Sequence, residues 1–213
     1  MGMVAGRRYD AVLFDLLTGL LDSWSLWNRV AGSAEAGRRW RAEYLRLTYG
    51  CGAYRAYGEL VAQAAAGVGL PEALAADLER DWGTLELWPG ALGTLRELGR
   101  SHRLGVVTNC SERLGRMAAE RLGVTFEGVV TAERAGYYKP HPAPYRLALE
   151  QLGLPADRVL FVAGSGYDLF GTAGVGLDTF WHNRLGLSAP AGAPAPLAAS
   201  AELADVLGLV SRR

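Results

Sequence analysis

Four stretches of this chain hold side chains that could act together on a small anion. Asp15 directly follows an apolar, β-prone run, and the pair Thr108-Asn109, Lys139 and Asp168 each lie close to a further apolar run. A carboxylate can act as a nucleophile that forms an ester, and a nearby ammonium keeps that carboxylate ionised and attracts an anion. Hydroxyl and amide donors can stabilise an oxyanion, and a second carboxylate can hold the lysine or orient a water. These residue types predict a hydrolase for a small anionic substrate.

The residue two positions after Asp15 limits that chemistry. It is Leu17, whose side chain can neither protonate a leaving group nor support a metal site. Mg²⁺ prefers octahedral oxygen coordination, usually with protein carboxylates, and Asp15 and Asp168 alone make a poor site. A carboxylate that attacks a phosphate dianion needs such a metal to offset the repulsion of like charges. Ordinary phosphatase activity is therefore not expected.

Each candidate also has a structural alternative. Asp15 could cap a helix or turn, and Lys139 could be a solvated loop residue. We favour a nucleophile at Asp15 because three other candidate groups accompany it, and a functional Lys139 because it is the only lysine in the chain. Thr108-Asn109 could cap the next helix and Asp168 could cap the segment after it, so these roles stay open between structure and catalysis.

The remaining reactive residue types carry weaker signals. His141 stands between two prolines and is interpreted as a turn residue, while His102 and His182 have no partners at metal-ligand spacing. The two cysteines, Cys51 and Cys110, lie far apart in the sequence and are expected to be free thiols in a reducing cytosol.

The candidates need a scaffold that brings strand ends together. Five apolar runs predict strands at 10–15, 103–109, 128–132, 159–163 and 178–182. Helical periodicity occurs between several of them, with Ser111, Pro142 and Ser200 suited to helix starts. Strands that alternate with helices imply the α/β class, with a doubly wound parallel sheet covered on both faces.

One long segment departs from this alternation. Residues 22–90 contain helical patterns but no convincing strand, so we expect a helical domain that lies as a lid over the sheet's C-terminal edge. The α/β core domain is then formed by residues 1–21 and 91–213. The Ala- and Pro-rich stretch 188–199 is predicted to be a loop.

Composition excludes several classes of partner. Lys plus Arg and Asp plus Glu both number 22 in 213 residues, so no net field recruits nucleic acid or an anionic membrane. The N-terminus lacks the apolar region of a signal peptide, and no window is apolar for long enough to span a bilayer. We expect a soluble, cytoplasmic monomer or homodimer whose partner is a small anionic substrate.

The candidate stretches occur in a fixed order: Asp15, Thr108-Asn109, Lys139-Pro140 and Gly164-Ser165-x-x-Asp168. Their order and spacing resemble the four motifs of the haloacid dehalogenase (HAD) superfamily, and the insertion at 22–90 is similar to that family's cap domain. The resemblance covers nearly the whole chain. It implies a Rossmann-like core, a helical cap after the first strand and a covalent ester on Asp15.

Within that superfamily the chain is most similar to the 2-haloacid dehalogenases. Phosphatases of the superfamily carry acids where this chain has Leu17 and Gly164. The dehalogenases need neither a metal nor the second acid, so the resemblance implies no cofactor, with Mg²⁺ possible but disfavoured. Tyr145, six positions after Lys139, matches a dehalogenase tyrosine. The runs Phe161–Asp168 and Trp181–Arg184 also resemble dehalogenase motifs.

The resemblance also assigns site residues. It implies catalytic roles for Asp15, Lys139 and Asp168, and substrate contacts by Thr18, Arg38, Thr108, Asn109, Tyr145 and Ser165. Arg38 best matches the arginine that binds the substrate carboxylate or the departing halide, with Arg39 or Arg41 as alternatives. Two departures stand out: Thr18-Gly19 reverses the family's Gly-Thr order, and Ala163 and Ser165 replace a serine and an asparagine.

The function expected from the sequence is a metal-independent 2-haloacid dehalogenase that releases halide from a small 2-haloalkanoic acid. One alternative is a hydrolase of another small anionic substrate, such as a weak phosphatase. Another is a non-catalytic HAD-like protein that binds a ligand or a partner.

Overall fold

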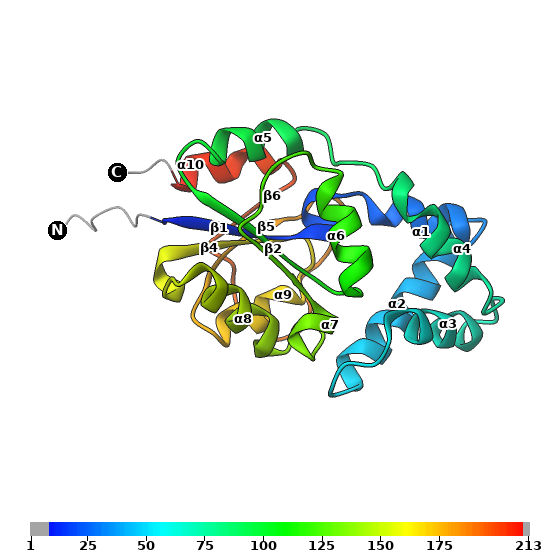
Figure 1. Cartoon of the computed structure of the whole chain (residues 1–213). Helices are drawn as coiled ribbons and strands as arrows, with labels where there is room; N and C mark the ends of the chain where they lie inside the picture. Colours follow the sequence, from blue (N-terminus) through cyan, green and yellow to red (C-terminus); the bar gives the residue numbers. More distant parts are fainter. Residues whose placement is uncertain (1–8, 211–213) are drawn as a thin grey trace.

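A parallel six-stranded sheet forms the centre of the computed structural model, which describes residues 9–210 (Figure 1). Its strands are β1 (Ala11–Asp15), β2 (Arg103–Thr108), β3 (Gly128–Thr131), β4 (Val159–Ala163), β5 (Asp178–His182) and β6 (Ala198–Ser200). The spatial order is β3-β2-β1-β4-β5-β6, and every neighbouring pair is parallel. The chain winds to one side of β1 and then to the other. Asp15 therefore lies at the switch point where open α/β sheets bind ligands, and the predicted fold class is confirmed.

Five of the six strands lie where the apolar runs predicted them. The sixth, β6, lies mostly within the stretch predicted to be a loop, and that prediction is wrong there. Its sequence, Ala198-Ala199-Ser200, carries no apolar signal, and it forms a strand by pairing along the edge of β5. Ser200 belongs to this strand, so it does not cap the last helix. The hydroxyl of Ser200 instead accepts a hydrogen bond from the Glu202 backbone N–H at 3.1 Å.

Helices cover both faces of the sheet. One face packs against α5 (Ala91–Leu98), α6 (Glu112–Glu120) and α10 (Val206–Val210), with η4 (Leu203–Asp205) before it. The other face packs against α8 (Pro142–Leu152) and α9 (Asp168–Ala173). Short turns α7 (Ala132–Ala135) and η3 (Ala156–Arg158) complete the core. Ser111 caps α6 and Pro142 begins α8, as the sequence predicts.

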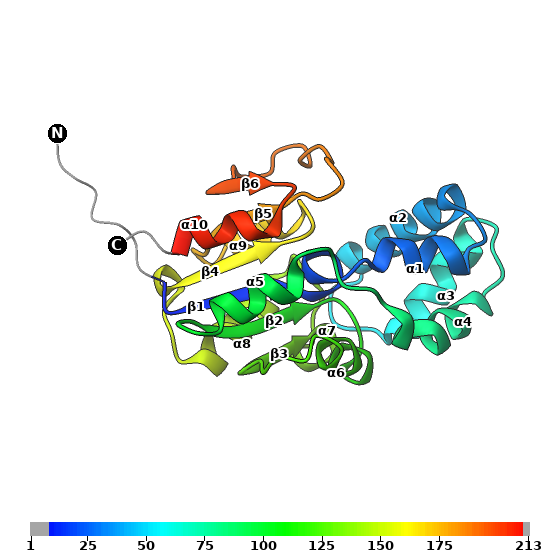
Figure 2. The same cartoon turned by 90° about the horizontal axis from the view of Figure 1, so that it is seen from above.

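A separate group of helices lies beyond the carboxyl ends of the strands (Figures 1 and 2). A single π-helical turn, η1 (Leu16–Leu20), leads from β1 into α1 (Ser23–Val30), α2 (Ala34–Gly50), α3 (Tyr57–Gly67), α4 (Leu74–Arg80) and η2 (Asp81–Thr84). Segment 22–90 contains no strand, only isolated bridge residues at Ala53 and Leu87. This helical layer agrees with the predicted lid, while its division from the core as a domain at 22 and 90 stays a prediction.

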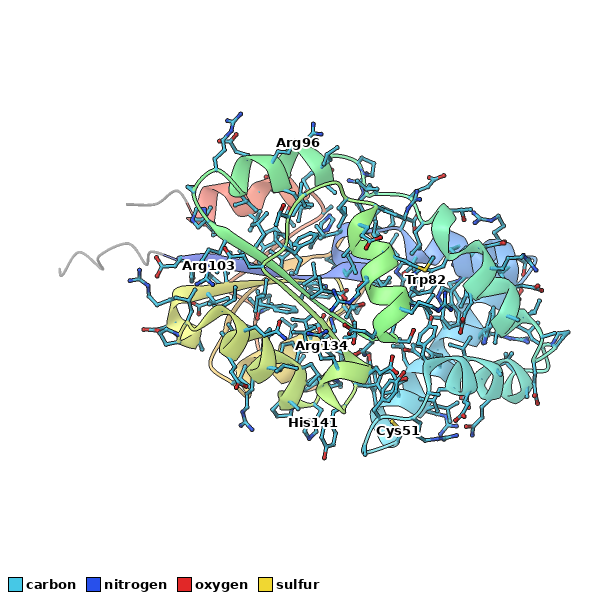
Figure 3. The ribbon with its side chains drawn as sticks, viewed as in Figure 1. Cys51, Trp82, Arg96, Arg103, Arg134 and His141 are labelled. Carbon is cyan, nitrogen blue, oxygen red and sulfur yellow. The ribbon has the colours of Figure 1, made fainter. Side chains whose placement is uncertain are left out.

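The helical layer and the sheet share one continuous apolar core, and side chains fill the space between them (Figure 3). Leu16 and Leu20 of η1 belong to the same buried cluster as Val12 of β1 and as Leu26 and Trp27 of α1. Side chains along β1 alternate between the two faces, because successive residues of a strand point in opposite directions. No helix within residues 9–210 is both long enough and apolar enough to cross a membrane.

Candidate active site

Asp15 ends β1 and also caps the turn that follows it. Its Oδ2 atom accepts hydrogen bonds from the backbone N–H of Thr18, at 3.2 Å, and from the Thr18 hydroxyl. Its Oδ1 atom lies 2.9 Å from Nζ of Lys139. Asp15 therefore uses one oxygen for the cap and the other for the charge pair, and its chemical role stays a prediction. The side chain lines a cavity beneath the helical layer.

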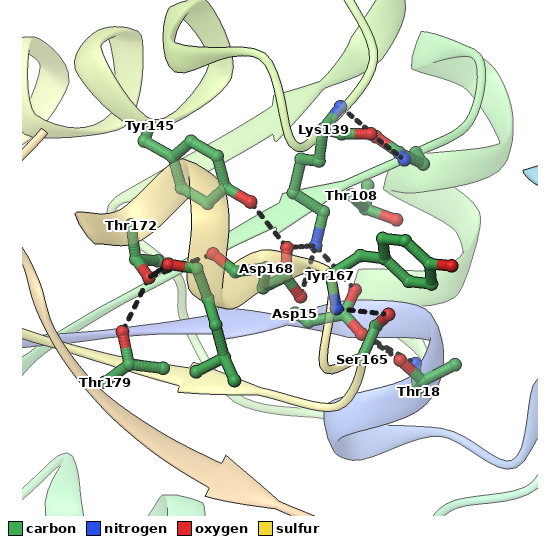
Figure 4. Close-up of polar contacts among 12 residues, drawn as sticks. Asp15, Thr18, Thr108, Lys139, Tyr145, Ser165, Tyr167, Asp168, Thr172 and Thr179 are labelled. Atoms are coloured by element: carbon green, nitrogen blue, oxygen red, sulfur yellow. Dashed lines mark hydrogen bonds and ion pairs between the residues drawn. The ribbon is translucent and has the colours of Figure 1, made fainter. Parts of the chain in front are cut away.

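Lys139 joins the two predicted carboxylates (Figure 4). Its Nζ lies 2.9 Å from Oδ1 of Asp15 and 3.0 Å from Oδ1 of Asp168. Burial lowers the pKa of Lys139, but the two carboxylates outweigh that effect and hold this pKa above its ordinary value. The amide of Asn109 fixes the lysine backbone, accepting from its N–H at 2.7 Å and donating to its carbonyl at 3.0 Å.

Asp168 lies at the start of α9 and is held from two sides. Besides Lys139, it accepts a hydrogen bond at 2.6 Å from the Tyr145 hydroxyl. Burial raises the pKa of Asp168, whereas Lys139 and the Tyr145 hydroxyl oppose that rise. Gly171, one turn further along α9, leaves room for the tyrosine, because a Cβ there would lie 2.2 Å from the Tyr145 ring.

The glycine at position 164 has a structural explanation, whereas nothing in the structure explains the reversed order of Thr18-Gly19. The loop after β4 passes so close to η1 that a Cβ on Gly164 would lie 2.2 Å from the backbone nitrogen of Gly19 and the carbonyl carbon of Thr18. Backbone atoms cannot move aside as a flexible side chain can, so position 164 excludes an acidic side chain. Thr18 meanwhile places its hydroxyl on Asp15.

A cavity of about 50 Å³ lies between these groups and the helical layer. Asp15, Lys139, Asp168 and Asn109 line its sheet side. Most of the remaining wall is apolar or aromatic and is formed by Leu17, Trp27, Tyr44, Leu45, Tyr49, Tyr57 and Tyr167. Such a wall excludes water and strengthens electrostatic interactions inside the cavity.

The arginine prediction needs a correction. Arg38 and Arg39 are exposed on α2, and neither lines the cavity, whereas Arg41 does. The buried positions of α2, which are Gly37, Trp40, Arg41, Tyr44 and Thr48, form one face of the helix. The helical spacing of the large aromatic residues Trp40 and Tyr44 is the sequence signal that distinguishes Arg41 from the other two arginines.

Arg41 enters the cavity without an acidic partner. Its Nη1 donates to the Ser23 hydroxyl at 2.8 Å, and its guanidinium carbon lies 4.1 Å from the centre of the Trp24 ring. Within residues 9–210 it forms no ion pair with a carboxylate. Burial lowers the pKa of Arg41, and the nearby charge of Asp15 opposes that effect. Ser23 also lines the cavity and was not predicted from the sequence.

Two further predicted substrate contacts lie outside the cavity wall. Thr108 is fully buried, its hydroxyl lies 3.7 Å from the Cys110 sulfur, and it does not line the cavity. Tyr145 is also fully buried and acts on Asp168 instead. Thr18, Asn109 and Ser165 do line the cavity. Burial raises the pKa of Cys110 to about 12, which makes this thiol a poor nucleophile.

The acidic groups do not suit a magnesium ion. Asp15 and Asp168 share the ammonium of Lys139, Leu17 presents an apolar side chain, and Gly164 has no room for an acid. Within residues 9–210 no three His, Cys, Asp or Glu side chains gather at metal-binding distance. The buried histidine nearby, His182, contacts the backbone: its Nδ1 atom lies 2.8 Å from the carbonyl oxygen of Gly19.

Sequence comparison relates this chain to known proteins. Residues 9–176 match the family model of the haloacid dehalogenase-like hydrolases. The haloacetate dehalogenase H-2 of Moraxella sp. (strain B) is 32% identical over 120 residues, which cover 55% of this chain and 54% of that protein. The match therefore spans about half the length of that relative. The (S)-2-haloacid dehalogenase of Xanthobacter autotrophicus is 28% identical over 188 residues, covering 79% of this chain and 72% of that protein.

A solved structure extends the likeness over almost the whole chain. The crystal structure of the L-2-haloacid dehalogenase RSc1362 superposes with a TM-score of 0.84 at 29% identity. The superposition covers 95% of this chain and 99% of that one. The helical layer is therefore part of the shared architecture as well as the sheet.

Proposed function

Because the chain belongs to the haloacid dehalogenase-like hydrolase family, we propose that it is a metal-independent 2-haloacid dehalogenase acting on a small 2-haloalkanoic acid. The observation that carries this proposal is the arrangement of charges around the cavity. An aspartate held by a lysine lies on the sheet side, and an arginine without an acidic partner lines the same cavity. A substrate with one carboxylate and an adjacent electrophilic carbon suits such a pair of groups.

In the first step Asp15 attacks the carbon that bears the halogen. A bond forms between a carboxylate oxygen and this carbon, while the carbon–halogen bond breaks and its electron pair leaves with the halide. Lys139 keeps Asp15 ionised, since an ammonium 2.9 Å away favours the charged form. Arg41 pairs with the substrate carboxylate or with the departing halide. Halide needs no proton as it leaves, so Leu17 is no obstacle to this step.

In the second step water cleaves the ester. Water adds to the side-chain carbonyl carbon of Asp15 while Asp168 accepts one of its protons. The bond between that carbon and the ester oxygen then breaks, and the alkoxide takes the proton to give a 2-hydroxy acid. The new carboxyl group on Asp15 loses its own proton to solvent and regenerates the nucleophile. Asn109 and Ser165 line the cavity and offer hydrogen bonds to the water or the oxyanion.

The size of the cavity supports a short substrate. A water molecule needs roughly 10–15 Å³ of such space, so a cavity of about 50 Å³ holds only a few groups of that size. Acids with two or three carbons fit this limit better than longer ones. Leu45 and Tyr57 lie on the wall that a longer alkyl chain would meet.

The test is halide release from the two enantiomers of 2-chloropropionate, measured with a chelator present. We expect turnover by the wild type and a loss of at least about 10³-fold in Asp15→Asn, because the amide is a far weaker nucleophile. Asp157→Asn removes an exposed aspartate on η3 and serves as the matched control, with unchanged turnover.

Three outcomes would reject the proposal. Wild-type halide release no faster than that of Asp15→Asn would remove the dehalogenase assignment. Phosphatase turnover that depends on both Mg²⁺ and Asp15 would favour the alternative hydrolase, and ligand binding without any turnover would favour the non-catalytic alternative.

A further inference from the structure

The guanidinium of Arg41 is held by two residues at the start of α1. Ser23 is fully buried and accepts a hydrogen bond from Nη1 at 2.8 Å. The Trp24 ring lies against the guanidinium, with 4.1 Å between the ring centre and the guanidinium carbon. Trp27 contributes a second, more distant ring at 6.0 Å. One contact fixes an edge of the planar group and the other fixes its face, so together they restrict its rotation.

The start of α1 is itself anchored. Asp22 caps the helix by accepting a hydrogen bond from the Ser25 backbone N–H at 3.0 Å. The backbone N–H of Asp22 donates to the Glu86 carbonyl at 2.8 Å, which ties the helix start to the segment that returns to the core. The positions of Ser23 and Trp24 are therefore set by the backbone.

The rest of the guanidinium remains available to a ligand. A guanidinium carries several N–H donors, and only Nη1 of Arg41 has a protein acceptor within residues 9–210. Within residues 9–210, no Arg41 nitrogen is both buried and without a hydrogen-bond partner. Since Arg41 lines the cavity, these unused donors are the ones that a ligand bound there would meet.

We propose that Ser23 and Trp24 are positioning residues that orient Arg41 toward an anionic ligand and so set the affinity of the cavity for small carboxylates. This inference rests on the proposed function for the identity of the ligand. The two residues act only through Arg41. Losing the hydroxyl frees one edge of the guanidinium, and losing the ring frees its face, so each loss lets the group leave the orientation that meets a carboxylate.

The experiment measures binding separately from turnover. In the full chain carrying Asp15→Asn, the dissociation constants of 2-chloropropionate and of acetate are determined by calorimetry. Adding Ser23→Ala or Trp24→Leu is expected to raise both constants about tenfold, whereas Trp24→Phe keeps an aromatic face and raises them less than about threefold. Ser188→Ala, which removes an exposed hydroxyl in the loop after β5, is the matched control and leaves them unchanged.

Kinetics and folding provide the second readout. In chains that retain Asp15, Ser23→Ala is expected to raise KM for 2-chloropropionate more than it lowers kcat, with circular dichroism unchanged. A purely structural role would lower the melting temperature and leave the dissociation constant of the folded protein as it was, which would overturn the inference.

The possible failures can be told apart. If acetate binding weakens in Ser23→Ala while the wild type releases no halide, the proposed function fails and the positioning role stands. If the Asp15→Asn parent binds neither acid, or if Ser23→Ala and Trp24→Leu bind both as the parent does, the positioning role is wrong.

Discussion

Two cations face the same cavity and are held in opposite ways. Lys139, on the sheet side, has two carboxylates within 3.0 Å. Arg41, on the helical layer, has a neutral hydroxyl and an aromatic ring. The charge of Lys139 is compensated within the protein, whereas the charge of Arg41 is left for a ligand. The sheet side thus holds a nucleophile ready to react, and the helical layer holds a receptor for an anion.

The difference also concerns stability. Breaking a buried ion pair leaves an uncompensated charge and is strongly destabilising. A buried cation with no acidic partner, such as Arg41, already carries the free-energy cost of taking its charge out of water in the folded protein. The two cations should therefore respond to neutral substitution with opposite signs in the free energy of unfolding.

The largest effect is expected for Lys139→Met. It leaves Asp15 and Asp168 facing each other and should lower the free energy of unfolding at pH 7 by about 3–5 kcal/mol. Without the ammonium the pKa of Asp168 rises further above its value in the unfolded chain. A raised carboxyl pKa favours folding at low pH, so the deficit should shrink as the pH falls from 7 toward 4.5.

Urea unfolding at several pH values measures this deficit. Arg96→Met, which removes an exposed cation on α5, is the control and should change stability by less than about 0.5 kcal/mol. A deficit in Lys139→Met that grew on acidification would contradict the assignment of its cause.

Arg41→Leu should affect ligand binding and stability in opposite directions. We expect the dissociation constant for 2-chloropropionate in the Asp15→Asn background to rise about 100-fold, because a charged hydrogen-bonding partner is lost. The free energy of unfolding should nevertheless rise by about 1 kcal/mol, since a buried unpaired charge is removed.

Calorimetry measures the dissociation constant of this variant, and urea unfolding measures its free energy of unfolding. Arg38→Gln is the control, since that side chain is exposed on the same helix and should affect neither quantity. A loss of stability in Arg41→Leu comparable to that of Lys139→Met would remove the distinction between the two cations.

A smaller effect is expected for Tyr145→Phe. The hydroxyl of Tyr145 lowers the pKa of Asp168, so its removal should raise that pKa and keep Asp168 protonated up to a higher pH. The acidic limb of the activity profile should therefore move to higher pH, with a stability loss of about 1.5 kcal/mol. The pH dependence of kcat for halide release measures this shift, and Tyr137→Phe provides a tyrosine outside the cavity as control. An unmoved acidic limb would show that Tyr145 does not tune Asp168.

The sheet side of the site could be predicted from the sequence. Apolar runs mark the central strands, and the carboxyl ends of parallel strands meet at one edge of a sheet. Asp15, Asn109 and Asp168 therefore had to come close together once the topology was known. Lys139 could be predicted as well, because it is the only lysine in the chain and lies between Asn109 and Asp168 in the order of the motifs.

Most of the remaining features depend on packing that local patterns do not encode. The choice among the arginines is a partial exception, because the spacing of Trp40 and Tyr44 marks the buried face of α2 and so favours Arg41 over Arg38. Thr108 and Tyr145 have the residue types of substrate contacts, yet they lie behind the cavity wall. The close approach of Gly164 to Gly19 joins segments far apart in the chain.

Covalent esterification of Asp15 distinguishes the proposed mechanism from direct attack by water. It can be followed in a single turnover of 2-chloropropionate in H₂¹⁸O, with enzyme in excess over substrate, by mass spectrometry of the product and of the peptide that contains Asp15. The proposed mechanism predicts an unlabelled hydroxyl in the lactate, because its oxygen comes from the aspartate, and one ¹⁸O in the Asp15 carboxylate. Labelled lactate with an unlabelled Asp15 peptide would mean that water attacks the substrate directly, and it would contradict the mechanism.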